Sequence, residues 1–169
     1  MTTLLHETLD KESIYMPTPA RITHIETFTA AEKLFRIELP RGFSLSHEPG
    51  QFVELSLLGI GECPISICSS PSRTDGTLEL CIRAVGKVTE AMHRLKPGAM
   101  VGIRGPFGRP FPDASFRGKD ILFVAGGLGL APLRSLIDEV LDNRGQFRRV
   151  ILMYGTRSPH DILFPRDLE

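Results

Sequence analysis

The sequence predicts an antiparallel six-stranded β-barrel followed by a truncated α/β domain. Six short runs with strand-like alternation occupy residues 20–105, each bounded by Gly, Pro, Asp or Ser, as in barrels and sandwiches. After residue 118 the pattern changes to an apolar run, a stripe with helical spacing and a second apolar run, which is typical of a βαβ unit. We therefore expect two domains that meet near residues 110–118.

Composition excludes several functional classes. The chain has 169 residues, 41% of them hydrophobic, and its 20 basic and 20 acidic residues give a formal net charge of zero. This balance does not favour nucleic acid as a partner. No apolar run reaches the roughly 18 residues that span a bilayer, and the N-terminus lacks a signal-peptide core. We expect a cytoplasmic protein without membrane insertion, whose polar residues 1–16 form an N-terminal tail or arm.

The predicted barrel strands follow one another with short turns. They are the runs at 20–29, 34–40, 50–58, 64–70, 77–85 and 100–105. In the second run Phe35 and Ile37 alternate with Arg36 and Glu38, which predicts one buried and one exposed face. The segment GKVTEAMHRLKPG at 86–98 predicts a short helix with Thr89 as its N-cap. The amides at its start can bind an anion, although a plain connector helix has the same pattern.

The α/β part begins with residues 120–125, a continuous apolar run typical of a strand buried on both faces. Pro132 fits the first turn of a following helix. The apolar stripe of this helix comprises Leu133, Leu136, Ile137, Val140 and Leu141. RRVILMYGT at 148–156 predicts a second buried strand, and SPHDILF at 158–164 predicts a helix or turn.

Glycines separate the first strand of this part from its helix. Gly126, Gly127 and Gly129 allow a sharp turn and the close approach of a pyrophosphate to the helix N-terminus. The pattern is G-G-x-G-x-x-P, with Pro132 at the third glycine position, and no acidic residue follows about twenty positions later. Nucleotide binding and a plain tight turn are both compatible with it.

Cysteines and histidines show no metal-ligand spacing. Cys63, Cys68 and Cys81 are expected to be reduced, mostly buried thiols. The five histidines are expected on the surface or in the core, so no metal site is predicted.

The order of the motifs is informative as a set. PISICSS, IRAVGKVT, GPFG, VAGGLGLAPL and MYGTRSPHDILF follow one another along the chain. This order resembles the ferredoxin–NADP reductase superfamily, and within it the gamma subunit of cytoplasmic sulfur-reducing hydrogenases, the B subunit of anaerobic sulfite reductase and the electron-transfer subunit of dihydroorotate dehydrogenase. The resemblance implies an FAD-binding barrel at 17–112 and a partial NAD(P)-binding domain at 117–169.

The resemblance also assigns residues to an FAD site. Cys63, Pro64, Ile65 and Ser66 take the place of an Arg-x-Tyr-Ser motif, so Ser66 is the expected catalytic residue at the flavin N5 edge. Cys63 replaces the arginine that clamps the pyrophosphate, and Ile65 replaces the stacking tyrosine. A second stretch is expected to contact the FAD and comprises Ile82, Arg83, Ala84, Gly86, Val88 and Thr89.

Each of these residues also has a plain structural interpretation. Arg83 is expected to supply the missing cation, but it can equally be a solvated strand residue. The Ser66 hydroxyl can be bonded locally, and Thr89 can serve only as a helix cap.

On the nucleotide side the resemblance assigns Gly126, Gly127, Gly129 and Pro132, together with Thr156 and Arg157. Arg157 can favour a 2′-phosphate, but one arginine does not decide between NAD and NADP. The implied reaction is hydride transfer from the nicotinamide to the flavin, followed by one-electron transfer to a redox partner subunit such as a hydrogenase, a sulfite reductase or a similar iron–sulfur protein. The alternative is a non-catalytic barrel that serves as a docking module with a degraded flavin site.

The short α/β part raises a question of completeness. Doubly wound nucleotide domains contain about five or six strands, whereas two are predicted here, so we expect one apolar sheet face to be uncovered. We favour a fragment of a longer protein over completion by a partner. A [2Fe–2S] centre is expected only if a missing C-terminal segment exists.

Overall fold

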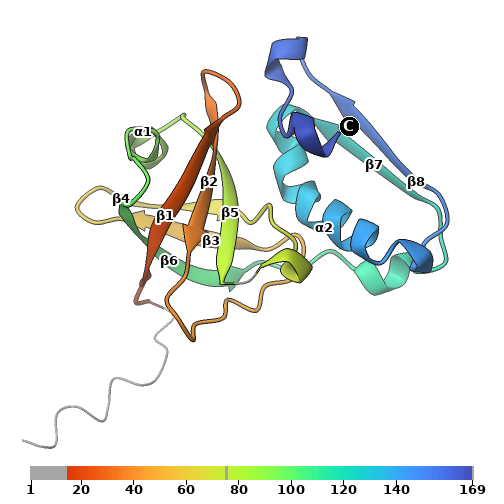
Figure 1. Cartoon of the computed structure of the whole chain (residues 1–169), viewed down its shortest axis with the longest axis horizontal. Helices are drawn as coiled ribbons and strands as arrows, with labels where there is room; N and C mark the ends of the chain where they lie inside the picture. The colour runs from red at the N-terminus through yellow and green to blue at the C-terminus, as the bar shows by residue number, and fades with distance from the viewer. Residues whose placement is uncertain (1–14, 75, 169) are drawn as a thin grey trace, which may run out of the picture.

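A computed structural model describes residues 15–74 and 76–168 of the chain. Residues 1–14 of the predicted tail therefore lie outside the described residues. Among the residues that are described, no helix combines the length and the apolar character needed to cross a membrane. The chain forms a strand-rich part and an α/β part, with helix α2 between the barrel strands and the last two strands (Figure 1).

The first part is one antiparallel sheet of six strands in the order β4-β3-β6-β1-β2-β5. The strands are β1 (Thr18–Thr27), β2 (Glu32–Glu38), β3 (Phe52–Leu57), β4 (Gly61–Ser66), β5 (Thr77–Arg83) and β6 (Met100–Phe107). The two edge strands approach each other where an isolated bridge joins Ile67 to Leu80. The predicted six-stranded barrel is thus confirmed as a barrel-like sheet that is not closed by a continuous ladder.

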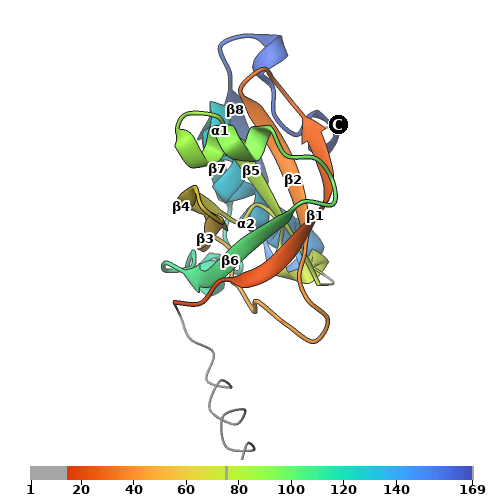
Figure 2. The ribbon, with the colours of Figure 1, turned by 90° about the vertical axis from the view of Figure 1, so that its left-hand side faces the viewer.

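The barrel core follows from the alternation of side chains. Phe35 and Ile37 of β2 are fully buried, whereas Arg36 and Glu38 between and beyond them are exposed. Helix α1 (Lys87–His93) covers one end of the barrel (Figure 2) and adds Met92 to the same core. Buried residues of five strands and α1 therefore pack in one core, and β4 adds only the half-buried Ile65 at its margin.

The start of α1 differs from the sequence prediction. Its N-cap is Gly86, in extended conformation, and Thr89 is the third residue of the helix. The Thr89 hydroxyl accepts hydrogen bonds from the amides of Val85 and Gly86, both at 3.0 Å, and donates to the carbonyl of Gly86. The prediction of Thr89 as N-cap is wrong because its side chain caps by reaching back from the first turn, as in a capping box.

The second part contains strand β7 (Ile121–Gly126), helix α2 (Leu130–Asp142) and strand β8 (Val150–Gly155). The two strands are parallel and pair in register from Ile121 with Val150 to Gly126 with Gly155. The remaining elements are short 3₁₀ turns at Pro71–Arg73, Asp113–Phe116, Gly127–Gly129, Arg144–Gln146, Pro159–Asp161 and Pro165–Asp167. Pro132 lies in the first turn of α2, as predicted.

One face of the β7–β8 sheet is open. Leu122 and Val124 of β7 are 57% and 67% exposed, and Ile151 and Met153 of β8 are similarly exposed. The prediction that both strands are buried on both faces is wrong, because α2 covers one face and no other described residue covers the second. The expected uncovered apolar face is confirmed. Leu141 of the predicted helical stripe is also exposed, at the last turn of α2.

Candidate functional site

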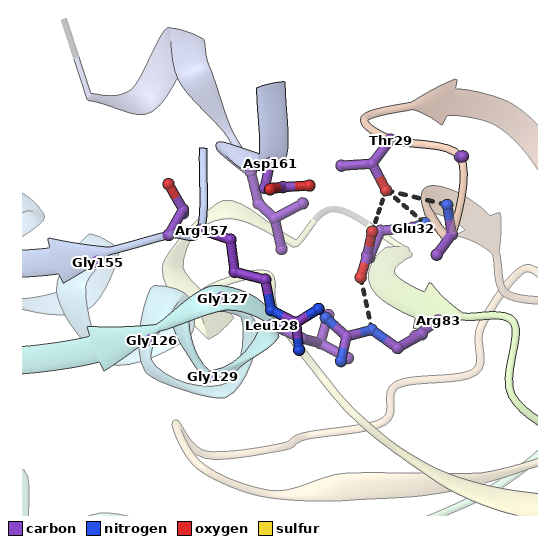
Figure 3. A pocket seen from close by; sticks show the side chains of 14 residues that line it. Thr29, Glu32, Arg83, Gly126, Gly127, Leu128, Gly129, Gly155, Arg157 and Asp161 are labelled. Atoms are coloured by element: carbon purple, nitrogen blue, oxygen red, sulfur yellow. Dashed lines mark hydrogen bonds and ion pairs between the residues drawn. The ribbon is translucent and has the colours of Figure 1, made fainter. Parts of the chain in front are cut away.

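A cleft of about 800 Å³ lies between the barrel and the α/β part (Figure 3). The barrel contributes the turn between β1 and β2 and the end of β5. The α/β part contributes the carboxyl ends of β7 and β8 and the segment after β8. The lining residues are Thr29, Ala30, Ala31, Glu32, Arg83, Gly126, Gly127, Leu128, Gly129, Gly155, Thr156, Arg157, Asp161 and Leu163. In α/β proteins, ligands bind at the carboxyl ends of the parallel strands, which is where this cleft lies.

The turn at Gly126–Gly129, called the glycine turn below, lines the cleft. Gly127 has a φ of +50°, a conformation that favours glycine. A Cβ added at Gly126 or Gly129 would meet no atom within 4 Å, so the backbone at both positions borders open space. The turn is a 3₁₀ helix that runs directly into α2, and the Leu130 amide already donates to the carbonyl of Gly127. The amides that lack a partner inside a helix are therefore those at the start of the turn itself. The backbone of this turn can therefore approach an anionic ligand closely.

Tyr154 of β8 holds this turn in place. Its hydroxyl donates to the carbonyl of Gly127 at 3.2 Å and accepts from the amide of Leu163 at 3.3 Å. A tyrosine hydroxyl is protonated at neutral pH and able to donate, and burial raises the pKa of Tyr154 further. Tyr154 is not among the predicted site residues, because it lies in an apolar run where a tyrosine carries no distinctive signal.

Arg83 enters the cleft from the end of β5. Its Nε donates to Glu32 Oε1 at 2.5 Å, and Glu32 in turn accepts a hydrogen bond from the Thr29 hydroxyl. The carboxylate of Glu32 is largely buried, whereas the Arg83 side chain is 44% exposed. Arg83 Nη2 lies 4.0 Å from where a Cβ on Gly127 would stand. Glu32 thus holds one edge of the guanidinium and leaves the terminal nitrogens toward the glycine turn.

Arg157 approaches the same place from the other part of the molecule. Its side chain and that of Arg83 point toward one another across the cleft (Figure 3). Within the described residues Arg157 forms no ion pair, and the neighbouring Thr156 hydroxyl donates to the carbonyl of Ser158 at 2.9 Å. Two guanidinium groups beside the glycine backbone of the turn are suited to a diphosphate or another multiply charged anion.

Three of the predicted site residues present no available side chain or amide to a ligand in the cleft. Pro132 does not line the cleft, and its carbonyl accepts from Ser135 at 3.4 Å. The side chain of Ile82 is buried in the barrel core. The Ala84 amide donates to the carbonyl of Ala31 at 2.9 Å, so it is already occupied.

The other group of predicted residues lies on β4, outside this cleft. This strand is at the edge of the sheet and pairs only with β3 along Gly61–Ser66. Cys63, Ile65 and Ser66 are half-buried, and Pro64 is exposed. Among the described residues the Ser66 hydroxyl has no hydrogen-bond partner. It is therefore free to bond to a ligand laid along this edge.

The electrostatics of β4 differ from those of the glycine turn. Burial raises the pKa of the Cys63 thiol, and the nearby carboxylates of Glu54 and Glu62 raise it further. Glu62 also forms an ion pair with Arg104 at 2.7 Å. A neutral thiol therefore occupies the position where the resemblance places a cation.

Helix α1 begins next to β4. A Cβ on Gly61 would lie 3.5 Å from the Val88 side chain, so the helix start and the strand start are in contact. The amides of Lys87, Val88 and Thr89 have no carbonyl partner inside the helix, and the Lys87 side chain is exposed. The Thr89 hydroxyl, in contrast, is occupied by its cap bonds. Backbone amides and Lys87 can thus hold a pyrophosphate here, and Ser66 can contact an isoalloxazine ring. Ile65 packs partly against the barrel core and can offer only its exposed part to the same ring. With this arrangement the residues fit FAD.

Comparison with known proteins gives a consistent result. The family described as oxidoreductase FAD-binding domain matches residues 19–111, and the oxidoreductase NAD-binding domain matches residues 123–169. The gamma subunit of sulfhydrogenase 1 from Pyrococcus furiosus is 45% identical over 152 residues, which are 88% of this chain and 52% of the relative. The probable dihydroorotate dehydrogenase B electron transfer subunit of the same organism is 35% identical over 149 residues, 88% and 53% of the two chains.

A solved structure shares the fold. The ferredoxin–NADP⁺ reductase from Neisseria gonorrhoeae, crystallised with FAD and NADP, superposes with a TM-score of 0.75 at 22% identity, over 89% of this chain and 62% of the other. The chain spans about half the length of the curated relatives it matches. Because the FAD-binding family covers more than half of its residues, the chain belongs to the oxidoreductases with an FAD-binding domain followed by an NAD-binding domain.

Proposed function

We propose that this chain is part of a cytoplasmic flavin-dependent electron-transfer subunit, which passes reducing equivalents between NAD(P)H and a partner redox subunit through FAD. The observation that carries this proposal is the cleft in which the glycine turn of the α/β part meets Arg83 of the barrel. The curated relatives are named as subunits of a sulfhydrogenase and of dihydroorotate dehydrogenase B. An iron–sulfur protein or a similar redox subunit is therefore the partner we propose.

On the flavin side we propose that β4 and α1 hold FAD. A bound flavin can accept a hydride and release single electrons, so it supplies the redox chemistry. The Ser66 hydroxyl donates a hydrogen bond at the N5 edge of the ring, and Ile65 covers one ring face by apolar contact. The amides of Lys87, Val88 and Thr89 and the Lys87 side chain face the pyrophosphate, and Gly86, whose own amide is bonded to Thr89, lets it approach the backbone. No acid or base is required of the protein, which has to orient two rings and exclude water.

On the nucleotide side we propose that the Gly126–Gly129 turn and Arg83 bind the diphosphate of NAD(P)H. This assigns Arg83 to the nucleotide, whereas the sequence analysis expected it at the FAD pyrophosphate. The reason is its position in the cleft, with its terminal nitrogens toward Gly127. Arg157 is exposed and unpaired among the described residues, so we propose that it contacts a 2′-phosphate and favours NADPH over NADH.

A second candidate function has one specific observation in its favour. Cys63 stands where a cation is expected, and two carboxylates lie near it. This would weaken the binding of an anionic cofactor and favours a docking module without flavin.

Purification of the chain with added FAD separates the two functions. The electron-transfer proposal predicts yellow protein that binds one FAD per chain, released unchanged on denaturation. It also predicts tighter binding of NADP⁺ than of NAD⁺, with the difference lost in Arg157→Ala. Colourless protein that does not take up FAD supports the docking module and overturns the proposal.

A further inference from the structure

Arg134 lies on α2, five residues beyond the glycine turn, and contacts the barrel directly. Its Nη1 donates to Glu79 Oε2 at 2.7 Å and to the carbonyl of Cys68 at 3.1 Å. Glu79 belongs to β5, and its second oxygen accepts from Arg36 Nη2 of β2 at 2.7 Å. The Arg134 side chain is only 15% exposed, so these bonds are shielded from solvent and salt.

The same guanidinium also holds the segment that follows β8. Its Nε donates to Asp167 at 2.5 Å, and its Cζ lies 4.8 Å from the centre of the Phe164 ring. Phe164 packs edge-on against Phe28 of the barrel, with ring centres 4.9 Å apart. Its φ of +52° is rare for an aromatic residue, so the surrounding contacts must hold it there. One side chain thus joins the barrel, α2 and the segment after β8.

Several residues that Arg134 holds, directly or through Phe164, lie close in sequence to a wall of the cleft. The Cys68 carbonyl instead lies two residues beyond Ser66, and the Cys68 amide is bonded to Glu79 of β5 without Arg134. Glu79 precedes Arg83 by four residues on β5, a distance of about 13 Å along a strand. Phe28 directly precedes the Thr29–Glu32 turn, and Phe164 follows Asp161 and Leu163. The glycine turn directly precedes α2. A movement at any of these contacts would therefore move a wall of the cleft, whereas β4 and the start of α1 belong to the barrel alone.

Charges around Arg134 favour the same arrangement. Burial by itself would raise the pKa of Glu79, but the hydrogen bonds and charges of Arg36 and Arg134 lower it below its usual value. Asp138, one turn along α2, lies 4.0 Å from Arg134 Nη2 and is also paired with Arg73 at 2.9 Å. Because Glu79 is ionised and buried, loss of Arg134 would leave a buried carboxylate with only the half-exposed Arg36 as its partner.

We propose that Arg134 is a positioning residue that sets the spacing between Arg83 and the glycine turn, and so controls nucleotide binding in the cleft without affecting FAD binding on β4 and α1. This inference rests on the proposed function for its ligands. Its physical basis is that the nucleotide site is divided between two parts of the molecule, while the FAD site lies in one.

The test compares three variants of the whole chain by titration with FAD and with NADP⁺. Arg134→Gln is expected to raise the dissociation constant for NADP⁺ about tenfold and to leave that for FAD within about twofold. Asp167→Asn releases only the segment after β8 and is expected to give a smaller rise. Asp142→Asn is the matched control, because Asp142 also joins α2 to the barrel, through Arg73 and Ser72, at the far end of the helix from the glycine turn.

A measurement without ligand keeps the inference separate from the proposed function. In the ligand-free chain, Arg134→Gln is expected to speed amide hydrogen exchange at residues 126–129 and 155–157 more than Asp142→Asn does. Equal exchange in the two variants, or a parallel loss of FAD and NADP⁺ affinity, would overturn the positioning role. Failure of the unmodified chain to bind FAD would overturn the proposed function, and the exchange data would still decide the role of Arg134.

Discussion

The barrel and the β7–β8 sheet bury their apolar side chains in opposite ways. The barrel encloses one core contributed by five of its strands and α1, with Phe35, Leu55 and Ile82 fully buried, while β4 adds only the half-buried Ile65. The β7–β8 sheet packs one face on α2 and exposes Leu122 and Val124 on the other. Two strands alone are marginally stable, so the α/β part depends on its contacts with the barrel. The two parts therefore differ in what stabilises them, although the cleft needs both.

The largest expected effect is a difference in alkylation rate between the cysteine on the edge strand β4 and the two cysteines buried in the barrel. Burial raises the pKa of Cys68 well above its usual value and that of Cys81 to about 12, whereas Cys63 is only half-buried on the open edge of β4. Because the thiolate is the reactive form and buried sites react only after opening, Cys63 should react at least about 10³-fold faster than the other two. Mass spectrometry of alkylated peptides measures the three rates.

The same alkylation experiment with added FAD tests whether the flavin covers β4. A flavin held along β4 should slow the alkylation of Cys63 and leave Cys68 and Cys81 unchanged. Equal rates for Cys63 and Cys68 would contradict the open edge of β4.

Matched substitutions in the two sheets should separate their stability. Leu55→Ala in the barrel core should lower the free energy of unfolding by about 3 kcal/mol. Leu122→Ala on the open face of β7 should change it by less than about 0.5 kcal/mol. Urea denaturation followed by circular dichroism measures both. A large loss from Leu122→Ala would show that this face is buried in solution, and sedimentation velocity would then identify self-association.

Glu79 should give the contact between the two parts a distinctive pH dependence. Its folded-state pKa is lowered, so its stabilising contribution is present above the unfolded value of about 4.3 and is lost as the pH falls through the folded pKa. Glu79→Gln should lower the free energy of unfolding by about 2 kcal/mol at neutral pH and flatten the loss below about pH 4. A variant that loses as much stability at pH 3 as at pH 7 would contradict this assignment.

Tyr154→Phe should have a small effect that is confined to the nucleotide side of the cleft. It removes the hydrogen bond to the Gly127 carbonyl and keeps the ring. A loss of about 1 kcal/mol corresponds to about fivefold weaker binding of NADP⁺, with FAD affinity unchanged as the internal control. Unchanged NADP⁺ affinity would show that Tyr154 does not shape the glycine turn.

Local patterns predicted most of the fold. Alternation along β2 and β5 and the glycines after β7 are properties of short segments, and they gave the barrel and the turn. The Arg83–Glu32 pair depends on the register of β2 with β5, across 51 residues, and no local pattern encodes it. The contacts of Arg134 depend on how two parts of the chain meet. The Thr89 cap was misplaced because a capping box and a simple N-cap use the same residue type.

The open face of the β7–β8 sheet has a similar explanation. A continuous apolar run indicates a strand that is suited to burial on both faces. The run does not tell which other elements pack on those faces. The sequence therefore predicted correctly that both strands are apolar, and incorrectly that both of their faces are buried. The uncovered face was predicted separately, from the small number of strands.

Hydrogen exchange with and without FAD tests the central claim most directly. The account predicts that FAD slows exchange of the amides in residues 61–66 and 86–90 and has little effect at 126–129. NADP⁺ added afterwards should protect residues 126–129. A chain that remains colourless and shows no FAD-dependent protection of either barrel segment would contradict the account.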